Sequence, residues 1–208
     1  MHFPAFVVAG VCLLLACGIG DVIGKPFILC VCLTLWAGGY MEKWQQEKEA
    51  CGKWMYARML YHSGGYKAAN EAYGKLYPLL KDRGAFLFEY GHSLHKSFLY
   101  GDSNKYLEEA GWYSSDPMVL NVMGKNYQEQ HCYEQAENFF YRAIHRLPGR
   151  IYPYYLLAKL YAEPDFYKPD KLKEVADSVL TKEPKVHSTA IDEMRSEVRE
   201  ILEKIKVK

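Results

Sequence analysis

Four side chains that are cationic, or become cationic on protonation, recur along the polar part of the sequence at intervals of 33 or 34 residues: Arg58, His92, Lys125 and Lys159. Four positions before each of them stands an aromatic ring or an amide: Trp54, Phe88, Asn121 and Tyr155. Cations donate strong hydrogen bonds to carboxylates, each contributing roughly 1.5 to 3 kcal/mol, and rings offer stacking surfaces. A fold that places all eight on one surface would bind an extended peptide with acidic side chains or a free carboxylate. The alternative is a set of long, solvated side chains on an exposed face.

Other residues with catalytic or metal-binding chemistry are few. His92 and His95 lie three apart, a spacing that can begin a metal site, but no third ligand accompanies them. His131 and Cys132 are adjacent in a predicted turn, without a third group to orient a nucleophile. The sequence also has no phosphate loop, dinucleotide fingerprint or serine-hydrolase elbow. We therefore expect no enzymatic activity, no catalytic residue, no metal site and no cofactor.

Small and large apolar residues recur at the same interval of about 34 residues. The clearest unit runs from Pro117 to Arg150, and its key positions are Leu120, Gly124, Tyr127, Tyr133, Ala136, Phe140, Ala143 and Pro148. These are the offsets of the tetratricopeptide repeat (TPR), a pair of antiparallel helices. Small residues let the two helices approach closely, and proline ends the second one. An unrelated helical bundle would not need the same small residues at the same offsets in successive units.

Similar units flank the clearest one. The second unit covers about Gly84 to Asp116, and the first covers about Ala50 to Arg83. A fourth begins at Ile151 but is irregular, because Pro164 and Pro169 bracket an insertion. We predict an all-α TPR superhelical solenoid over residues 42–187, followed by a capping helix in residues 188–208. In such a solenoid the first helix of each unit lines the concave surface, which places the eight residues above in one groove.

The first 41 residues predict a membrane-spanning helical hairpin. No charged side chain occurs from Phe3 to Gly20 or from Pro26 to Tyr40. These spans, about 18 and 15 residues long, are near or below the length that crosses a bilayer. A cleaved signal peptide with a loose lipoprotein box ending at Cys17 is one alternative, and a buried apolar hairpin is another. Against a signal peptide, no Lys or Arg precedes the apolar core, and a second apolar span follows it.

The charge distribution bears on partners and orientation. With 26 basic and 25 acidic residues the formal net charge is +1, so we expect no nucleic-acid partner. Of six cysteines, only Cys51 and Cys132 lie outside the apolar spans, which excludes a disulfide framework. Basic residues follow the second span and none precedes the first, which favours a cytoplasmic repeat domain.

The polar part also resembles the C-terminal TPR region of Bacteroidetes-type O-antigen ligase/polymerase membrane proteins, over roughly Trp44 to Ile205. The resemblance is carried by Lys75–Asp82, Phe88–Gly91, Met123–Gln128, Ile151–Tyr161 and Leu180–Val186. It implies a bacterial inner-membrane location, with the apolar segment corresponding to the last membrane helices of such a protein. Those proteins carry their glycan-transfer chemistry in a longer multi-span portion that this sequence lacks.

Two functions are therefore expected. The first is a scaffold tethered to the membrane through residues 3–40, whose groove recruits a protein or peptide partner. The second is an accessory or detached C-terminal part of a machine for surface-polysaccharide assembly, docked onto a multi-span glycan-transfer protein.

Overall fold

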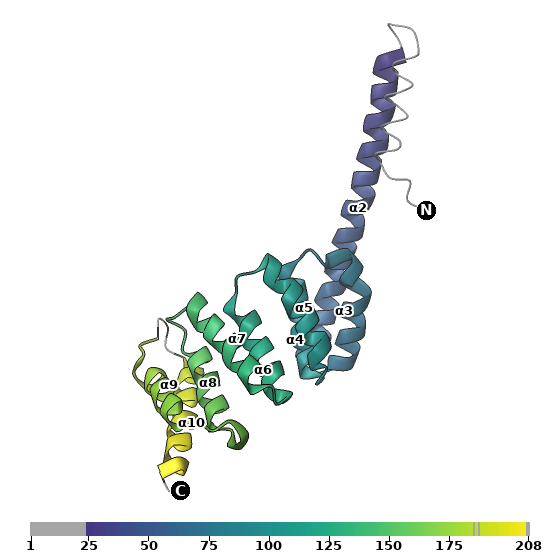
Figure 1. The fold of residues 1–208 in the computed structure, drawn as a ribbon. Helices are drawn as coiled ribbons and strands as arrows, with labels where there is room; N and C mark the ends of the chain where they lie inside the picture. Colours follow the sequence, from purple (N-terminus) through teal and green to yellow (C-terminus); the bar gives the residue numbers. More distant parts are fainter. Residues whose placement is uncertain (1–23, 185, 187, 207–208) are drawn as a thin grey trace. The chain divides into compact units, whose positions relative to one another are not determined.

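The computed structural model describes residues 24–184, 186 and 188–206, and the side chains of residues 38–205 within these ranges. No β-strand occurs among the described residues. The elements, in chain order, are α2 (Gly24–His62), α3 (Tyr66–Leu80), α4 (Gly84–Lys96), α5 (Tyr100–Tyr113), α6 (Pro117–Glu129), α7 (Tyr133–Arg146), α8 (Tyr152–Ala162), the short 3-10 helix η1 (Pro164–Phe166), α9 (Pro169–Thr181) and α10 (Thr189–Lys206) (Figure 1). The chain divides into two compact units, residues 1–53 and 54–208.

The first unit contains most of α2. The second predicted membrane span, Pro26–Tyr40, lies within this helix, whereas the first, Phe3–Gly20, falls outside the described residues. Among the residues that the structure does describe, no helix has the length and apolar character needed to cross a membrane. The boundary expected at residues 41 and 42 falls inside α2, which continues as one helix to His62.

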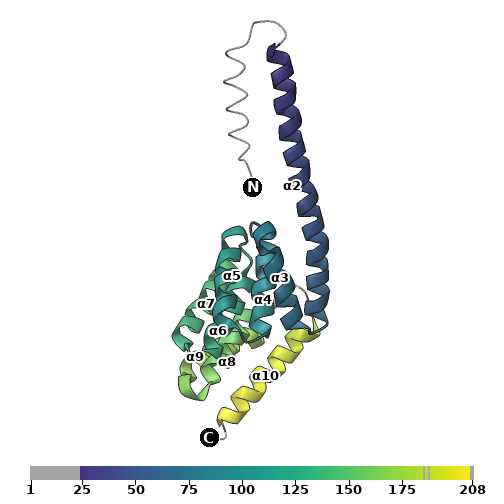
Figure 2. The same ribbon diagram turned by 90° about the vertical axis from the view of Figure 1, so that its right-hand side faces the viewer.

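The second unit is an all-α, TPR-like array of helix pairs. The end of α2 precedes α3, and the later pairs are α4 with α5, α6 with α7, and α8 with α9. Consecutive pairs stack because α5 packs on α6 and α7 packs on α8 (Figure 2). The first helices also run side by side, since α4 contacts α6 and α6 contacts α8. The predicted repeat fold is therefore confirmed at this level.

Small residues stand where the two helices of a pair touch, as the sequence predicts. A Cβ atom added to Gly124 would collide with the ring of Phe140, and one added to Gly91 would lie 2.7 Å from Cγ of Leu107. Alanines at the other close contacts, including Ala136 and Ala143, have no exposed surface. The packing density of protein interiors explains this selection, because an extra methyl group would force the helices apart.

The turn inside each of the first three pairs has one backbone geometry. Gly64, Phe98 and His131 have positive φ angles of 81°, 62° and 57°. In each turn the next residue's N–H donates to a carbonyl five residues earlier, as in Gly65 to Leu60 at 2.9 Å. This is the Schellman motif, which satisfies the free carbonyls at a helix end. His131 and Cys132 thus belong to a turn, as the sequence predicts.

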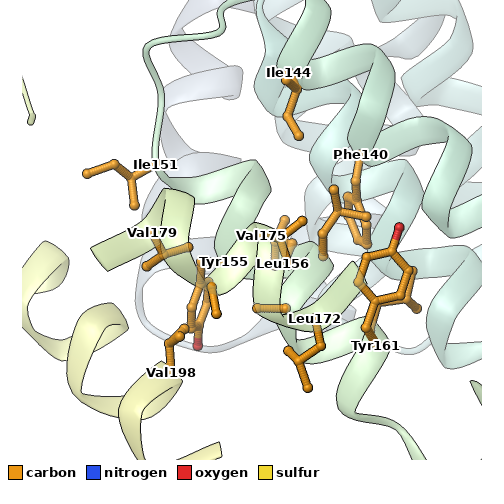
Figure 3. Packing of buried hydrophobic residues seen from close by; sticks show 14 of the residues in the cluster. Phe140, Ile144, Ile151, Tyr155, Leu156, Tyr161, Leu172, Val175, Val179 and Val198 are labelled. Carbon is orange, nitrogen blue, oxygen red and sulfur yellow. The ribbon is translucent and has the colours of Figure 1, made fainter. Parts of the chain in front are cut away.

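The irregular fourth pair is held by a carboxylate. Glu137 of α7 accepts hydrogen bonds from Tyr161 at 2.6 Å, Lys168 at 3.0 Å and Lys171 at 2.6 Å. These contacts tie the insertion around η1 and the start of α9 back to the third pair. The core between α7, α8, α9 and α10 contains Phe140, Leu172 and Val198, and Val198 points from α10 toward Tyr155 (Figure 3).

Candidate functional site

The eight residues singled out by the sequence lie on the first helices of the four pairs. Trp54 and Arg58 are on α2, Phe88 and His92 on α4, Asn121 and Lys125 on α6, and Tyr155 and Lys159 on α8. We call this surface, made of residues 54–62 of α2 with α4, α6 and α8, the first-helix face. The repeat spacing places equivalent residues on adjacent helices, because one pair of helices occupies about 34 residues.

At the N-terminal end of the first-helix face, Arg58 already has an internal partner. Its guanidinium donates to both oxygens of the Glu89 carboxylate, at 3.1 and 2.5 Å, and the indole N–H of Trp54 donates to the same carboxylate at 2.7 Å. The bond to Glu89 raises the pKa of Arg58. Since Glu89 belongs to α4, this cluster joins the first pair to the second and leaves Arg58 little capacity for an external carboxylate.

His92 does not supply a positive charge at neutral pH. Burial, with help from nearby His95, Lys96 and Lys125, lowers the pKa of His92 to about 4. Its Nδ1 lies 3.0 Å from the hydroxyl of Tyr61, and its ring stacks on Phe88 with centroids 5.7 Å apart. The predicted row of four cations therefore has a neutral ring at its second position, because the surrounding helices exclude water from the imidazole.

His95, the other member of the histidine pair, belongs to a buried polar network. Its Nδ1 lies 2.6 Å from Oδ1 of Asn126, and the Asn126 amide donates to Ser103 at 2.8 Å and to Asn104 at 2.7 Å. Ser103 in turn donates to the carbonyl oxygen of Gly91 at 2.7 Å. This network joins α4, α5 and α6. No group of three or more residues suited to a metal ion occurs among the described residues.

Asn121 is buried rather than exposed on the first-helix face, where a ligand would contact it. Only 2% of its surface is exposed, and its amide nitrogen makes a weak contact of 3.7 Å with the sulfur of Met118. Its Oδ1 is buried without a hydrogen-bond partner among the described residues.

Of the four cations that the sequence singled out, Lys125 is the one without a partner among the described residues. Within the part of the chain that the structure describes, its ammonium group has no hydrogen bond or ion pair. Burial and the nearby Lys96 and Lys159 lower the pKa of Lys125, and Glu129 opposes them. A half-buried ammonium group without a partner gains more from a bound carboxylate than a solvated one does.

At the C-terminal end, the terminal helix supplies a carboxylate. The hydroxyl of Tyr155 donates to Oε2 of Glu197 on α10 at 2.5 Å, and the Lys159 ammonium lies 3.7 Å from the same oxygen. Lys159 also lies 5.4 Å from the centre of the Tyr155 ring. Burial, followed by the bond to Glu197, raises the pKa of the Tyr155 hydroxyl. The contact repeats the N-terminal arrangement, with an aromatic residue and a cation sharing one glutamate.

A pocket of about 320 Å³ lies between α6, α8 and α10. Its walls include Lys125 and Glu129 from α6, Lys159 from α8, and Glu193 and Glu197 from α10. The pocket thus brings together the two lysines of the C-terminal half of the first-helix face. It also brings carboxylates of α10 to the same place.

Three partners in this arrangement did not emerge from the sequence: Glu89, Tyr61 and Glu197. Glu89 directly follows Phe88, a predicted groove residue. An acidic residue at this place on a first helix could have indicated an internal partner for the nearby cations. Glu197 lies on the amphipathic C-terminal segment, which gave no indication of the lysine that it contacts.

The fold defines this protein as a TPR-like helical-repeat protein. No protein-family model matches the chain, and no curated protein matches it significantly. Its fold is similar to a crystal structure of MamA, a TPR protein, at a TM-score of 0.55 and 16% identity, over 73% of this chain and 97% of that one. It is also similar to residues 41 to the end of MamA from Desulfovibrio magneticus RS-1 (TM-score 0.55, 16% identity, 98% of both chains). The MamA RS-1 ArsTM double mutant gives the same score and identity over 100% of this chain and 99% of that one. At this identity the likeness concerns the fold alone.

Proposed function

We propose that the repeat array is a protein-interaction module, and that the C-terminal half of its first-helix face binds a carboxylate-bearing segment of a partner protein. The observation that carries the proposal is Lys125, a half-buried cation at the wall of a pocket, with no ion-pair partner among the described residues. Lys159 lines the same pocket and is the second cation for the ligand. TPR-type folds present their first helices to extended peptides, which supports binding rather than catalysis.

Binding of a fluorescein-labelled peptide of eight glutamates, followed by fluorescence anisotropy, tests the proposal. Replacing both Lys125 and Lys159 with alanine is expected to weaken binding about tenfold or more, because each charged hydrogen bond contributes roughly 1.5 to 3 kcal/mol. Lys67→Ala with Lys75→Ala is the matched control, since both lysines are exposed on α3 and the change in net charge is identical. Equal loss in the two double variants, or no loss in either, would overturn the proposal.

The proposed location is the bacterial inner membrane, with residues 3–40 as the tether and the repeat array in the cytoplasm. The uncharged spans and the basic residues that follow them support this arrangement. Extraction of membranes with alkaline carbonate tests the tether. If residues 3–40 anchor the protein, it is expected to stay in the membrane fraction. Labelling of Cys132 by an impermeant maleimide in intact cells, in a Cys51→Ser background, tests the side. Labelling before the inner membrane is broken would exclude the cytoplasm.

A second candidate is an accessory role in surface-polysaccharide assembly, supported by the resemblance to O-antigen ligase-type proteins. Affinity purification from solubilised membranes distinguishes it from the first. Recovery of multi-span glycan-transfer proteins that persists in the Lys125 and Lys159 double variant would favour the accessory role. Recovery of partners that depends on these lysines would favour the interaction module.

A further inference from the structure

The C-terminal helix α10 is attached differently from the helices of the repeats. Val198 is its one buried residue among those described, whereas α8 buries seven residues and α6 buries eight. Two hollows adjoin α10: the pocket of about 320 Å³ and an apolar hollow of about 800 Å³ that is lined by Pro184, Ile191 and Met194. A helix with few buried contacts opens at a lower free energy than the core helices do.

The polar contacts of α10 are few and concentrated. Arg195 donates to the carbonyl oxygens of Val179 at 3.2 Å and of Lys182 at 2.7 Å, near the end of α9. Glu197 contacts Tyr155 and Lys159 on α8. Glu197 is thus the one α10 side chain whose described polar contacts reach the first-helix face.

The charges in the pocket oppose the ligand proposed above while α10 is in place. Lys125 and Lys159 contribute two positive charges, and Glu129, Glu193 and Glu197 contribute three negative ones. An incoming carboxylate would meet like charges and would find Lys159 and Tyr155 already bound to Glu197. Release of Glu197 removes this competition at the same atoms.

We propose that α10 is an intramolecular competitor, and that its Glu197 holds the place that a carboxylate of the partner takes when α10 moves off the first-helix face. This inference rests on the proposed function and adds its regulation. In the closed form the partner's carboxylate binds weakly. In the open form it accepts the hydrogen bond from Tyr155 and pairs with Lys159 and Lys125.

The test uses the full chain and the same labelled octaglutamate peptide. Glu197→Gln keeps the size of the side chain and removes its charge, and is expected to tighten binding about three- to tenfold, the effect of one charged contact. Glu200→Gln is the matched control, because Glu200 is exposed on the same helix and does not line the pocket. It is expected to change binding less than about twofold.

Hydrogen exchange provides a second readout that does not depend on the variant's affinity. Saturating peptide is expected to accelerate exchange of the amides in residues 189–206 and to slow exchange in α6 and α8. If the wild-type chain binds the peptide, but Glu197→Gln binds it equally or more weakly and exchange in α10 is unchanged, the competitor role of α10 is overturned and the proposed function is not. Absence of binding by both chains would overturn the proposed function and this inference together.

Discussion

In the N-terminal half of the first-helix face, Arg58 is bound by Glu89 and His92 is neutral, so neither of the two predicted cations in this half is available to a ligand. In the C-terminal half, Lys125 has no partner among the described residues, and Lys159 pairs with Glu197 of the terminal helix α10. Both halves have the same repeat spacing along their first helices. The difference shows that a periodic sequence places side chains, whereas the neighbouring helix decides which of them remain free to bind.

The two glutamates give the largest expected difference between the halves. Side chains of Arg58 and Glu89 are 36% and 24% exposed, compared with 46% and 51% for Lys159 and Glu197. Glu89→Gln should lower the free energy of unfolding by about 2 kcal/mol, because several donors lose their charged acceptor. Glu197→Gln should lower it by about 0.5 kcal/mol or less. Urea unfolding followed by circular dichroism measures both, and equal losses would remove the distinction between a structural and an exchangeable pair.

The neutral imidazole makes the N-terminal half sensitive to acid. The pKa of His92 is about 4 in the folded chain against an ordinary value of 6.5, so between these values the unfolded chain binds a proton that the folded chain does not. Stability should therefore fall as the pH drops from 7 to 5, with about 1 to 2 kcal/mol of the loss due to His92. His92→Gln should reduce the slope in urea unfolding at a series of pH values. An identical slope in this variant would show that His92 titrates normally.

In the C-terminal half, the unpaired ammonium group of Lys125 should lower the free energy of unfolding. Lys125→Met removes a half-buried cation without a partner and should raise the free energy of unfolding by about 0.5 to 1 kcal/mol. Lys159→Met should not raise the free energy of unfolding, because the substitution removes the contacts of the lysine with Tyr155 and Glu197. Thermal unfolding of the two variants compares them. A stabilised Lys159→Met together with an unaffected Lys125→Met would reverse the assignment of the free cation.

The smallest effects test whether the halves share one backbone plan. Phe98 and His131 adopt positive φ in equivalent turns, where an L side chain costs about 1 to 2 kcal/mol, partly offset by the greater entropy of an unfolded glycine. Phe98→Gly and His131→Gly should each raise the free energy of unfolding by about 0.5 kcal/mol. Phe98 is 77% exposed, so little burial is lost with its ring. Opposite signs for the two variants would show that the two turns differ.

Much of the fold was predictable because small residues mark each close contact. Gly91 and Gly124 lie against Leu107 and Phe140, and the prolines at 164 and 169 bracket the irregular insertion. The network around Asn126 was not predictable, because its members come from three helices and no local pattern links them. The same reason concealed the pairing of Glu89 with Arg58, 31 residues away, and of Glu197 with Lys159, 38 residues away.

The sequence by itself determined the helical repeats, the register of the eight side chains on the first helices, and the amphipathic terminal helix. These features depend on local spacing, because a helix of fixed pitch converts positions along the chain into faces. Only the tertiary structure decided that His92 is neutral, that Arg58 is bound by Glu89, and that Glu197 reaches Lys159. Charge and availability depend on burial and on atoms within a few ångströms, and those atoms come from helices that the chain brings together only when it folds.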